Sequence, residues 1–269
     1  MELDGDGGDE MSLIAGRRRW LRALVAGMAV VTFSSRNFAM QKNEVDKFTV
    51  FTFGDSILDC DRYNDYRVHP GQLIVRNDDR LFPGFKGRDL VSLGSARLEH
   101  RAQDGGRVGD LPWQSRGLKA SGPAVALVTV GGNDLLSGLA TDSGEGVKRF
   151  KQQLEAFLDA LHVRPVLLGT VFDPTFGDDS RNFLSIDARI ARPNFNRMNA
   201  IIAELAPRYG ELVDVHAHFL GGDPSWFTRT IEPSLRGASE VRAAFLPAVL
   251  RVRNEQIGQM GTRVEISSD

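Results

Sequence analysis

The chain of 269 residues has room for one large α/β domain or two small ones. Hydrophobic residues make up 42% and charged residues 25% of the sequence, which excludes a disordered or fibrous protein. The formal net charge of −2 gives no reason to expect nucleic acid as a partner, and one cysteine, Cys60, with no histidine pair at metal-binding spacing argues against a metalloenzyme.

Residues 1–46 differ in composition from the rest of the chain. Residues 1–10 are acidic and rich in glycine, which is typical of disorder. The run Arg17-Arg18-Arg19 precedes an apolar stretch, Ala23 to Phe33, that is too short to span a bilayer. The arginine run and the stretch together resemble a twin-arginine leader for export to the periplasm. Since no small-x-small cleavage site follows this stretch, we favour translation from Met40 and a cytoplasmic protein without stable membrane insertion. Residues 1–46 are therefore read as a disordered extension or a leader.

Five apolar runs bounded by turn residues predict strands in the rest of the chain. They are Phe48–Phe53, Arg97–Ala102, Ala124–Val130, Pro165–Phe172 and Leu212–Val215. Apolar residues at helical spacing predict helices over Val108–Leu118, Gly146–His162, Asn194–Tyr209 and Ala238–Leu250. Alternating strands and helices favour a parallel sheet covered on both faces. The sequence therefore predicts a single α/β domain over residues 47–251, followed by a C-terminal tail, residues 252–269.

Two segments, Cys60–Ser95 and Asp173–Pro193, are predicted to be long loops. In open parallel sheets, ligands bind beyond the carboxyl ends of the strands. We therefore expect the functional residues directly after the apolar runs.

Ser56 follows the first predicted strand in the turn Gly54-Asp55-Ser56. A serine at the end of a buried strand presents its hydroxyl at the top of the sheet, as a nucleophile must. The alternative is that Ser56 caps the next helix.

Glycines and an asparagine follow the second and third predicted strands. In Asp104-Gly105-Gly106 a backbone amide near a helix start can donate a hydrogen bond to an oxyanion, and Asn133 in Gly131-Gly132-Asn133-Asp134 can donate its side-chain amide. Taken singly, each segment also fits an ordinary turn.

Together, in this order, the blocks Phe51-Thr52-Phe53-Gly54-Asp55-Ser56 and Gly131-Gly132-Asn133-Asp134 resemble the SGNH or GDSL hydrolase family, over about residues 47–251. The resemblance implies a three-layer α/β/α, flavodoxin-like fold and an esterase or lipase-like acyl hydrolase. It also implies that Ser56 is the nucleophile and that Gly105, Asn133 and the Ser56 amide hold the oxyanion. No metal or organic cofactor is expected, and the expected partner is a small-molecule ester.

The last block of the family, Asp-x-x-His-Pro, is altered here. The matching stretch is Arg229-Thr230-Ile231-Glu232-Pro233, so that Arg229 stands where the family has aspartate and Glu232 where it has histidine. A general base works best with a pKa near 7. Glutamate, with an ordinary pKa of about 4.3, is poorer by roughly 3 kcal/mol.

The identity of the base therefore stays open between several groups. Glu232 is one candidate, and burial would raise the pKa of its carboxylate. His218 and His216 follow Asp214 at the end of the fifth predicted strand, where either could serve Ser56 with Asp214 or Glu232 as its orienting carboxylate. We favour an arrangement that includes both His218 and Glu232.

Two functions follow from these patterns. The first is hydrolysis of carboxylic esters through an acyl-enzyme at Ser56. The alternative is a catalytically silent relative that binds an acylated or glycan ligand in the same cleft, because the Asp-x-x-His block is missing.

Overall fold

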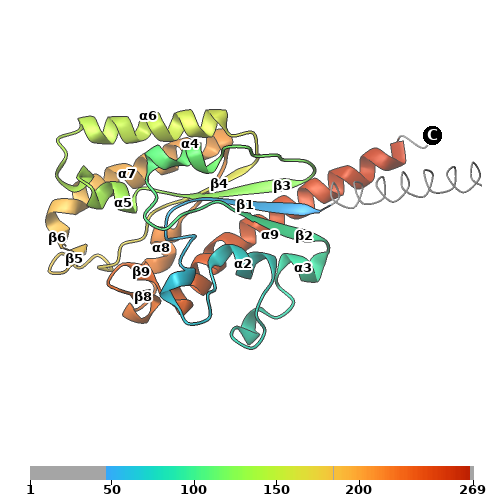
Figure 1. Ribbon diagram of the computed structural model, residues 1–269, viewed down its shortest axis with the longest axis horizontal. Coiled ribbons are helices and arrows are strands. Elements are labelled where there is room, and N and C mark those ends of the chain that lie inside the picture. Colours follow the sequence, from blue (N-terminus) through green and yellow to red (C-terminus); the bar gives the residue numbers. More distant parts are fainter. Residues whose placement is uncertain (1–46, 184, 267–269) are drawn as a thin grey trace, which may run out of the picture. The chain divides into compact units, whose positions relative to one another are not determined.

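The computed structural model describes residues 47–183 and 185–266, which are built around a parallel sheet with strand order β2-β1-β3-β4-β7 (Figure 1). Its strands are β1 (Phe48–Gly54), β2 (Ala96–His100), β3 (Ala124–Thr129), β4 (Val166–Gly169) and β7 (Gly210–Val213). Every residue of β1 and β3 is buried, because helices cover both faces of the sheet, whereas the edge strand β2 is only partly buried. The predicted α/β fold with five parallel strands is confirmed.

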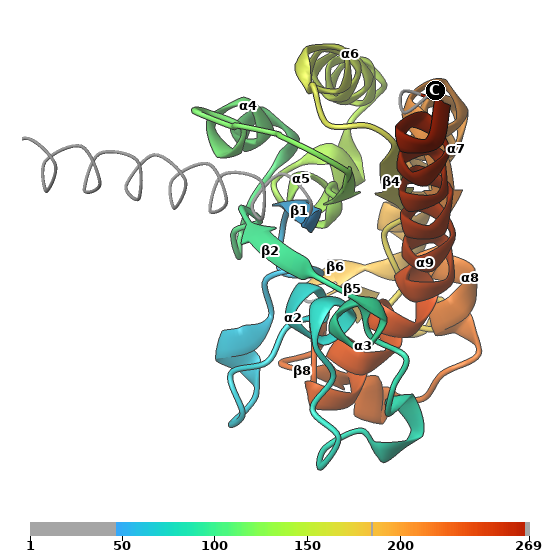
Figure 2. The same cartoon turned by 90° about the vertical axis from the view of Figure 1, so that its right-hand side faces the viewer.

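The helices form two layers. Helix α6 (Glu145–Ala160) packs against α7 (Ala188–Tyr209), and α2 (Pro70–Val75) packs against α9 (Leu235–Ile266). Figures 1 and 2 show α4 (Leu111–Gln114) and α6 on one side of the sheet, and α2 and α9 on the other. The face of α6 that its apolar spacing predicts is buried, with Val147, Phe150, Leu154, Phe157 and Leu158.

The two segments predicted as long loops contain short elements, so that prediction was wrong in part. Cys60–Ser95 includes α2 and α3 (Leu90–Leu93), both too short to show a helical repeat in the sequence. Asp173–Pro193 includes the hairpin of β5 (Asn182–Phe183) and β6 (Ile186–Asp187) and the start of α7. Helix α7 begins before the predicted start because the Asp187 side chain accepts a hydrogen bond from the Arg189 amide, 2.9 Å away.

At the C-terminal end, residues 252–266 continue helix α9, although the sequence indicated a tail from residue 252. The expectations on residues 1–46 lie outside the described residues. Within residues 47–183 and 185–266, no helix has both the length and the apolar character needed to cross a bilayer.

Gly54 ends β1 in a turn that only glycine permits. Its φ is +125°, and a Cβ at this position would lie 1.6 Å from the Thr129 carbonyl oxygen on the neighbouring strand. The Gln114 side chain holds the same residue from the other side: the Gly54 amide donates to Gln114 Oε1 at 2.7 Å, and Gln114 Nε2 donates to the Gly54 carbonyl at 2.8 Å. The turn that presents Ser56 is therefore fixed by close packing and by two buried hydrogen bonds.

Candidate active site

Ser56 lies in the wall of a narrow cavity of about 40 Å³ at the carboxyl end of the sheet. The cavity is lined by residues that follow β1, β3 and β4, together with residues of α5 (Gly132–Leu136), α7, β5 and the segment after β8. Its apolar lining comprises Ile57, Leu135, Leu136, Val171, Phe172, Pro174, Phe183, Phe195 and Ile231. Because β1, β3 and β4 are neighbours in the sheet, their carboxyl ends bring Ser56 and Asn133 to this one cavity, as expected.

Glu232 reaches Ser56 from a hairpin formed by β8 (Phe227–Thr228) and β9 (Glu232–Pro233). Burial raises the pKa of Glu232 above its ordinary value, while the neighbouring Ser56 hydroxyl opposes this shift. The second carboxylate oxygen, Oε2, is buried and has no hydrogen-bond partner among the described residues. The glutamate that stands in the family's histidine position is thus next to the predicted nucleophile, with a pKa shifted in the direction that a general base needs.

Asp55 is completely buried beneath this site. Burial raises the pKa of its carboxyl group to about 8, although hydrogen bonds from the Ile57 amide (3.1 Å) and the Thr129 hydroxyl (3.0 Å) act in the opposite direction. Asp55 is therefore mainly protonated at neutral pH and adds little negative charge beside Ser56. Its hydrogen bonds tie the Ser56 turn to strand β3.

The loop with Gly105 lies against α5. Asn133 Nδ2 donates a hydrogen bond to the Gly106 carbonyl at 3.1 Å, and Asp134 Oδ2 accepts one from the Val108 amide at 3.1 Å. Gly105 has a φ of +80°, in the left-handed region that favours glycine. In the described part of the chain, no residue accepts a hydrogen bond from the Gly105 or Ser56 amide.

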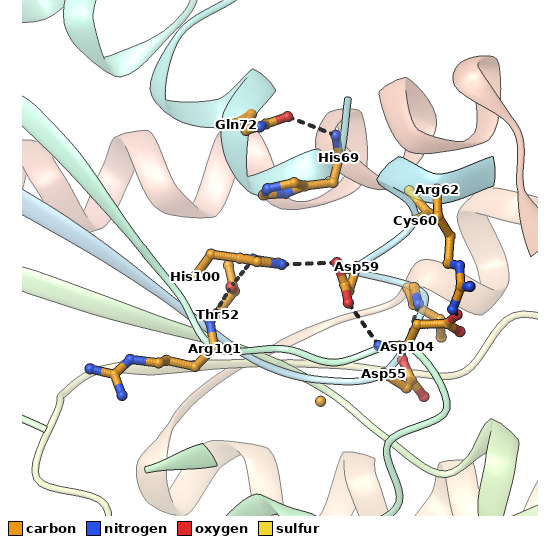
Figure 3. A network of polar contacts seen from close by, with 12 residues as sticks. Thr52, Asp55, Asp59, Cys60, Arg62, His69, Gln72, His100, Arg101 and Asp104 are labelled. Atoms are coloured by element: carbon orange, nitrogen blue, oxygen red, sulfur yellow. Dashed lines mark hydrogen bonds and ion pairs between the residues drawn. The ribbon is translucent and has the colours of Figure 1, made fainter. Parts of the chain in front are cut away.

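A second network, which the sequence analysis missed, holds the start of the Gly105 loop (Figure 3). Asp59 Oδ2 accepts a hydrogen bond from the Asp104 amide at 2.8 Å, and Asp59 Oδ1 lies 3.1 Å from His100 Nε2. His100 Nδ1 lies 2.7 Å from the Thr52 hydroxyl, and the His69 ring stacks on His100 with 3.9 Å between ring centroids. Burial raises the pKa of Asp59, but the hydrogen bonds from His100 and Asp104 outweigh it and lower that pKa overall. No local pattern in the sequence points to this network, because its members come from four separate segments.

His69 is the most deeply buried ionisable member of the network. Burial, followed by the neighbouring His100, lowers the pKa of His69 to about 3, so this imidazole is neutral near pH 7. Its Nδ1 has no hydrogen-bond partner among the described residues. Its stacking on His100 therefore adds no positive charge beside Asp59.

The two histidines considered as bases lie on α8 (Val215–Leu220), outside the lining of the Ser56 cavity. His218 Nε2 lies 3.0 Å from Glu240 Oε2 on α9, and its ring lies 5.5 Å from that of Trp226. The His216 ring packs edge-on against Phe195 with 5.1 Å between centroids, and burial lowers the pKa of His216. The structure thus places His218 with Glu240 and leaves Glu232 with Ser56.

Asp214, the expected orienting carboxylate, has another role. Its Oδ1 accepts hydrogen bonds from the Ala217 amide and the Thr170 hydroxyl, both at 3.0 Å, and so caps the start of α8. Cys60 is buried, and burial raises the pKa of its thiol, which keeps it unreactive. Across the described ranges, no three side chains of His, Cys, Asp or Glu converge as metal ligands.

Comparison with solved structures shows a shared fold. The acetylxylan esterase Axe2 from Geobacillus stearothermophilus is 17% identical, with a TM-score of 0.55, and the match covers 76% of this chain and 94% of that one. The lipase Lip_vut3 from a goat rumen metagenome is 17% identical (TM-score 0.55; 76% and 97% covered), and the acetyl xylan esterase AlAXEase is 21% identical (TM-score 0.55; 75% and 99%). No curated protein matches the chain.

The family comparison covers most of the described structure. Residues 52–238, from the middle of β1 to the first turn of α9, match the GDSL-like lipase/acylhydrolase family. This range contains the serine turn, the Gly105 loop, Asn133 and the altered block with Glu232. The chain therefore belongs to the GDSL-like lipase/acylhydrolase family.

Proposed function

We propose that the protein hydrolyses carboxylic esters with short acyl groups through an acyl-enzyme at Ser56. The observation that carries this proposal is the placement of the Ser56 hydroxyl, in the wall of a narrow apolar cavity, beside the partly buried carboxylate of Glu232, close enough to affect the pKa of that carboxylate. In acylation, Ser56 Oγ forms a bond to the acyl carbon and gives its proton to Glu232, which passes it to the departing alcohol. A water molecule then loses a proton to Glu232 and attacks the acyl carbon. The bond between this carbon and Ser56 Oγ breaks, Oγ takes the proton back from Glu232, and the carboxylic acid is released.

We assign the role of base to Glu232 because burial makes its carboxylate more basic than that of an ordinary glutamate. An ordinary glutamate falls short of a base with a pKa near 7 by roughly 3 kcal/mol. Burial raises the pKa of Glu232 and so reduces this deficit. His218 pairs with Glu240 and has no part in the proposed proton transfer.

The developing oxyanion is held by the amides of Ser56 and Gly105 and by the side chain of Asn133. Neither amide has a hydrogen-bond partner among the described residues, so both can donate to a substrate. Asn133 Nδ2 uses one hydrogen on the Gly106 carbonyl and keeps a second for the oxyanion. The bond to Gly106 also fixes the orientation of Asn133 relative to the Gly105 loop, which is the preorganisation that such a site requires.

The size of the cavity selects the acyl group. A volume of about 40 Å³ is room for about three water-sized groups. We expect 4-nitrophenyl acetate to be hydrolysed, with kcat/KM falling about tenfold or more between the acetate and the butyrate, because extra methylenes must displace packed side chains. Steady-state kinetics on an acetate-to-octanoate series tests this. A constant kcat/KM along the series would contradict the assignment of short acyl groups. If the protein turns over no ester and its Ser56 does not react with a fluorophosphonate, it is a catalytically silent binding protein.

Asn133→Ala is expected to lower kcat about 10²–10³-fold with little change in KM, because the lost hydrogen bond forms fully only in the transition state. Steady-state kinetics on the acetate ester measures both constants. Ser137→Ala, an exposed change at the C-terminal end of the same helix, α5, serves as the control. A large rise in KM with kcat intact would make Asn133 a substrate-binding residue instead.

A further inference from the structure

A polar hollow of about 410 Å³ lies next to the β8–β9 hairpin, separate from the apolar cavity. It is lined by residues 62–65, Arg67, Thr228 and Arg229, and we call it the cationic hollow. Its lining contains three arginines, Arg62, Arg67 and Arg229, against one carboxylate, Asp65. The hollow thus presents an excess of positive charge in a space about ten times larger than the cavity beside Ser56.

The three arginines are not equally neutralised. Arg62 forms an ion pair with Asp104 at 2.8 Å. Neither Arg67 nor Arg229 forms an ion pair with a carboxylate of the described residues. The Arg229 guanidinium carbon lies 5.1 Å from the centre of the Tyr63 ring, a cation–π contact that orients the charge without neutralising it. Two guanidinium groups at this hollow therefore remain available to an anion.

Side-chain hydrogen bonds fix the loops that line the hollow. The Asn64 side chain closes the loop from Cys60 to Val68: its Nδ2 donates to the Cys60 carbonyl at 3.2 Å and to the Val68 carbonyl at 2.8 Å. The Tyr63 hydroxyl donates to Asp104 Oδ2 at 2.8 Å, which ties the hollow to the Gly105 loop. Arg67 and Arg229 have φ values of +52° and +47°, in the left-handed region that non-glycine residues rarely adopt. The loops therefore hold both arginines in conformations that the chain would not adopt by itself.

The β8–β9 hairpin separates the two spaces. Thr228 pairs with Glu232 across the hairpin, Arg229 lines the cationic hollow and Ile231 lines the apolar cavity. Arg229 and Arg62 are also close enough to Glu232 to lower the pKa of its carboxylate, against the larger effect of burial. A substrate bound at Ser56 with its acyl group in the apolar cavity can thus extend its alcohol portion past Glu232 into the cationic hollow.

We propose that the cationic hollow binds a carboxylate on the alcohol portion of the substrate, so that the enzyme prefers anionic esters to neutral esters of the same shape. Arginine recognises a carboxylate through two parallel charge-assisted hydrogen bonds, which gives it both affinity and orientation. Arg229 occupies the position at which the family resemblance implies an aspartate, so the altered block supplies a binding group. This inference rests on the proposed ester hydrolysis at Ser56.

The test compares 4-acetoxybenzoate with 4-acetoxybenzamide, which differ in charge and little in shape. We expect wild-type kcat/KM to be about tenfold higher for the anionic ester, as one charged hydrogen-bonding contact provides. Arg67→Gln and Arg229→Gln should each remove most of this preference, and Arg67→Gln should change kcat/KM for the neutral ester less than about threefold. Arg67→Gln is the cleaner arm, because Arg67 is not among the charges that act on Glu232. Arg116→Gln, an exposed arginine outside the hollow, is the matched control and should leave the preference unchanged.

An absent preference in the wild type, or an equal loss on both esters in the two variants, would overturn the proposal. Calorimetric titration separates this failure from failure of the proposed function. We expect the wild type to bind 4-hydroxybenzoate more tightly than 4-hydroxybenzamide, and Arg67→Gln to abolish the difference. Tighter binding of the benzoate without turnover of either ester would retain the anion site and reject ester hydrolysis. Equal binding of both compounds, with turnover of both esters, would reject the anion site alone.

Discussion

Ser56→Ala is expected to lower kcat for acetate esters by about 10⁴-fold or more, because no acyl-enzyme can form without the hydroxyl. The change removes one half-buried oxygen, and Gly54, Asp55 and Gln114 still fix the turn, so the fold is expected to persist. Steady-state kinetics and thermal unfolding measure the two effects. A thermal midpoint within a few degrees of the wild type, with activity lost, assigns the loss to chemistry. Full activity in Ser56→Ala would show that this serine is not the nucleophile.

Glu232→Gln is expected to lower kcat/KM about 10²–10⁴-fold, the range attributed to general-base catalysis, because an amide cannot accept the proton from Ser56. The pH dependence follows from the same assignment. The pKa of Glu232 is raised above its ordinary value, and the carboxylate must be ionised to act as a base. Wild-type activity should therefore be present above this raised pKa and be lost as the pH falls through it. A full pH–rate profile of the wild type measures this loss of activity at low pH, its acid limb.

Glu232→His separates loss of a base from loss of a structural carboxylate. A histidine at this position restores the residue that the family resemblance implies, and the variant should retain more activity than Glu232→Gln, with an acid limb near pH 6.5. His218→Ala and His216→Ala should leave the wild-type acid limb in place, since neither ring lines the Ser56 cavity. Loss of nearly all activity in His218→Ala, with Glu232→Gln active, would transfer the role of base to His218.

The central sheet could be predicted because its signals are local. Strands β1 and β3 are buried on every residue, so they are mostly apolar runs, and the Gly54 and Gly131 turns mark where they end. Parallel strands then bring Ser56 and Asn133 to one edge without further information. For these residues, position along a strand is enough to predict position in space.

The rest of the site depends on contacts between segments far apart in the sequence. Asp59 holds the Asp104 amide and His100 through hydrogen bonds that span 45 and 41 residues, and neither has a spacing that could be recognised beforehand. His218 lies five residues after the end of β7, at the edge of the sheet where a base is expected, yet its imidazole pairs with Glu240 on α9. The partner of a side chain beyond a strand end is set by tertiary packing, which hydrophobic periodicity does not encode.

The central claim, that Ser56 is a nucleophile activated by Glu232, is tested most directly by mapping the adduct of a fluorophosphonate on the wild-type protein by mass spectrometry and following its rate of formation against pH. We predict one adduct, on the peptide that contains Ser56, formed more slowly as the pH falls and Glu232 is protonated. The rate in Glu232→Gln should be low at every pH. An adduct on another residue in a preparation that hydrolyses esters, or an equal labelling rate in the wild type and Glu232→Gln, would contradict the mechanism.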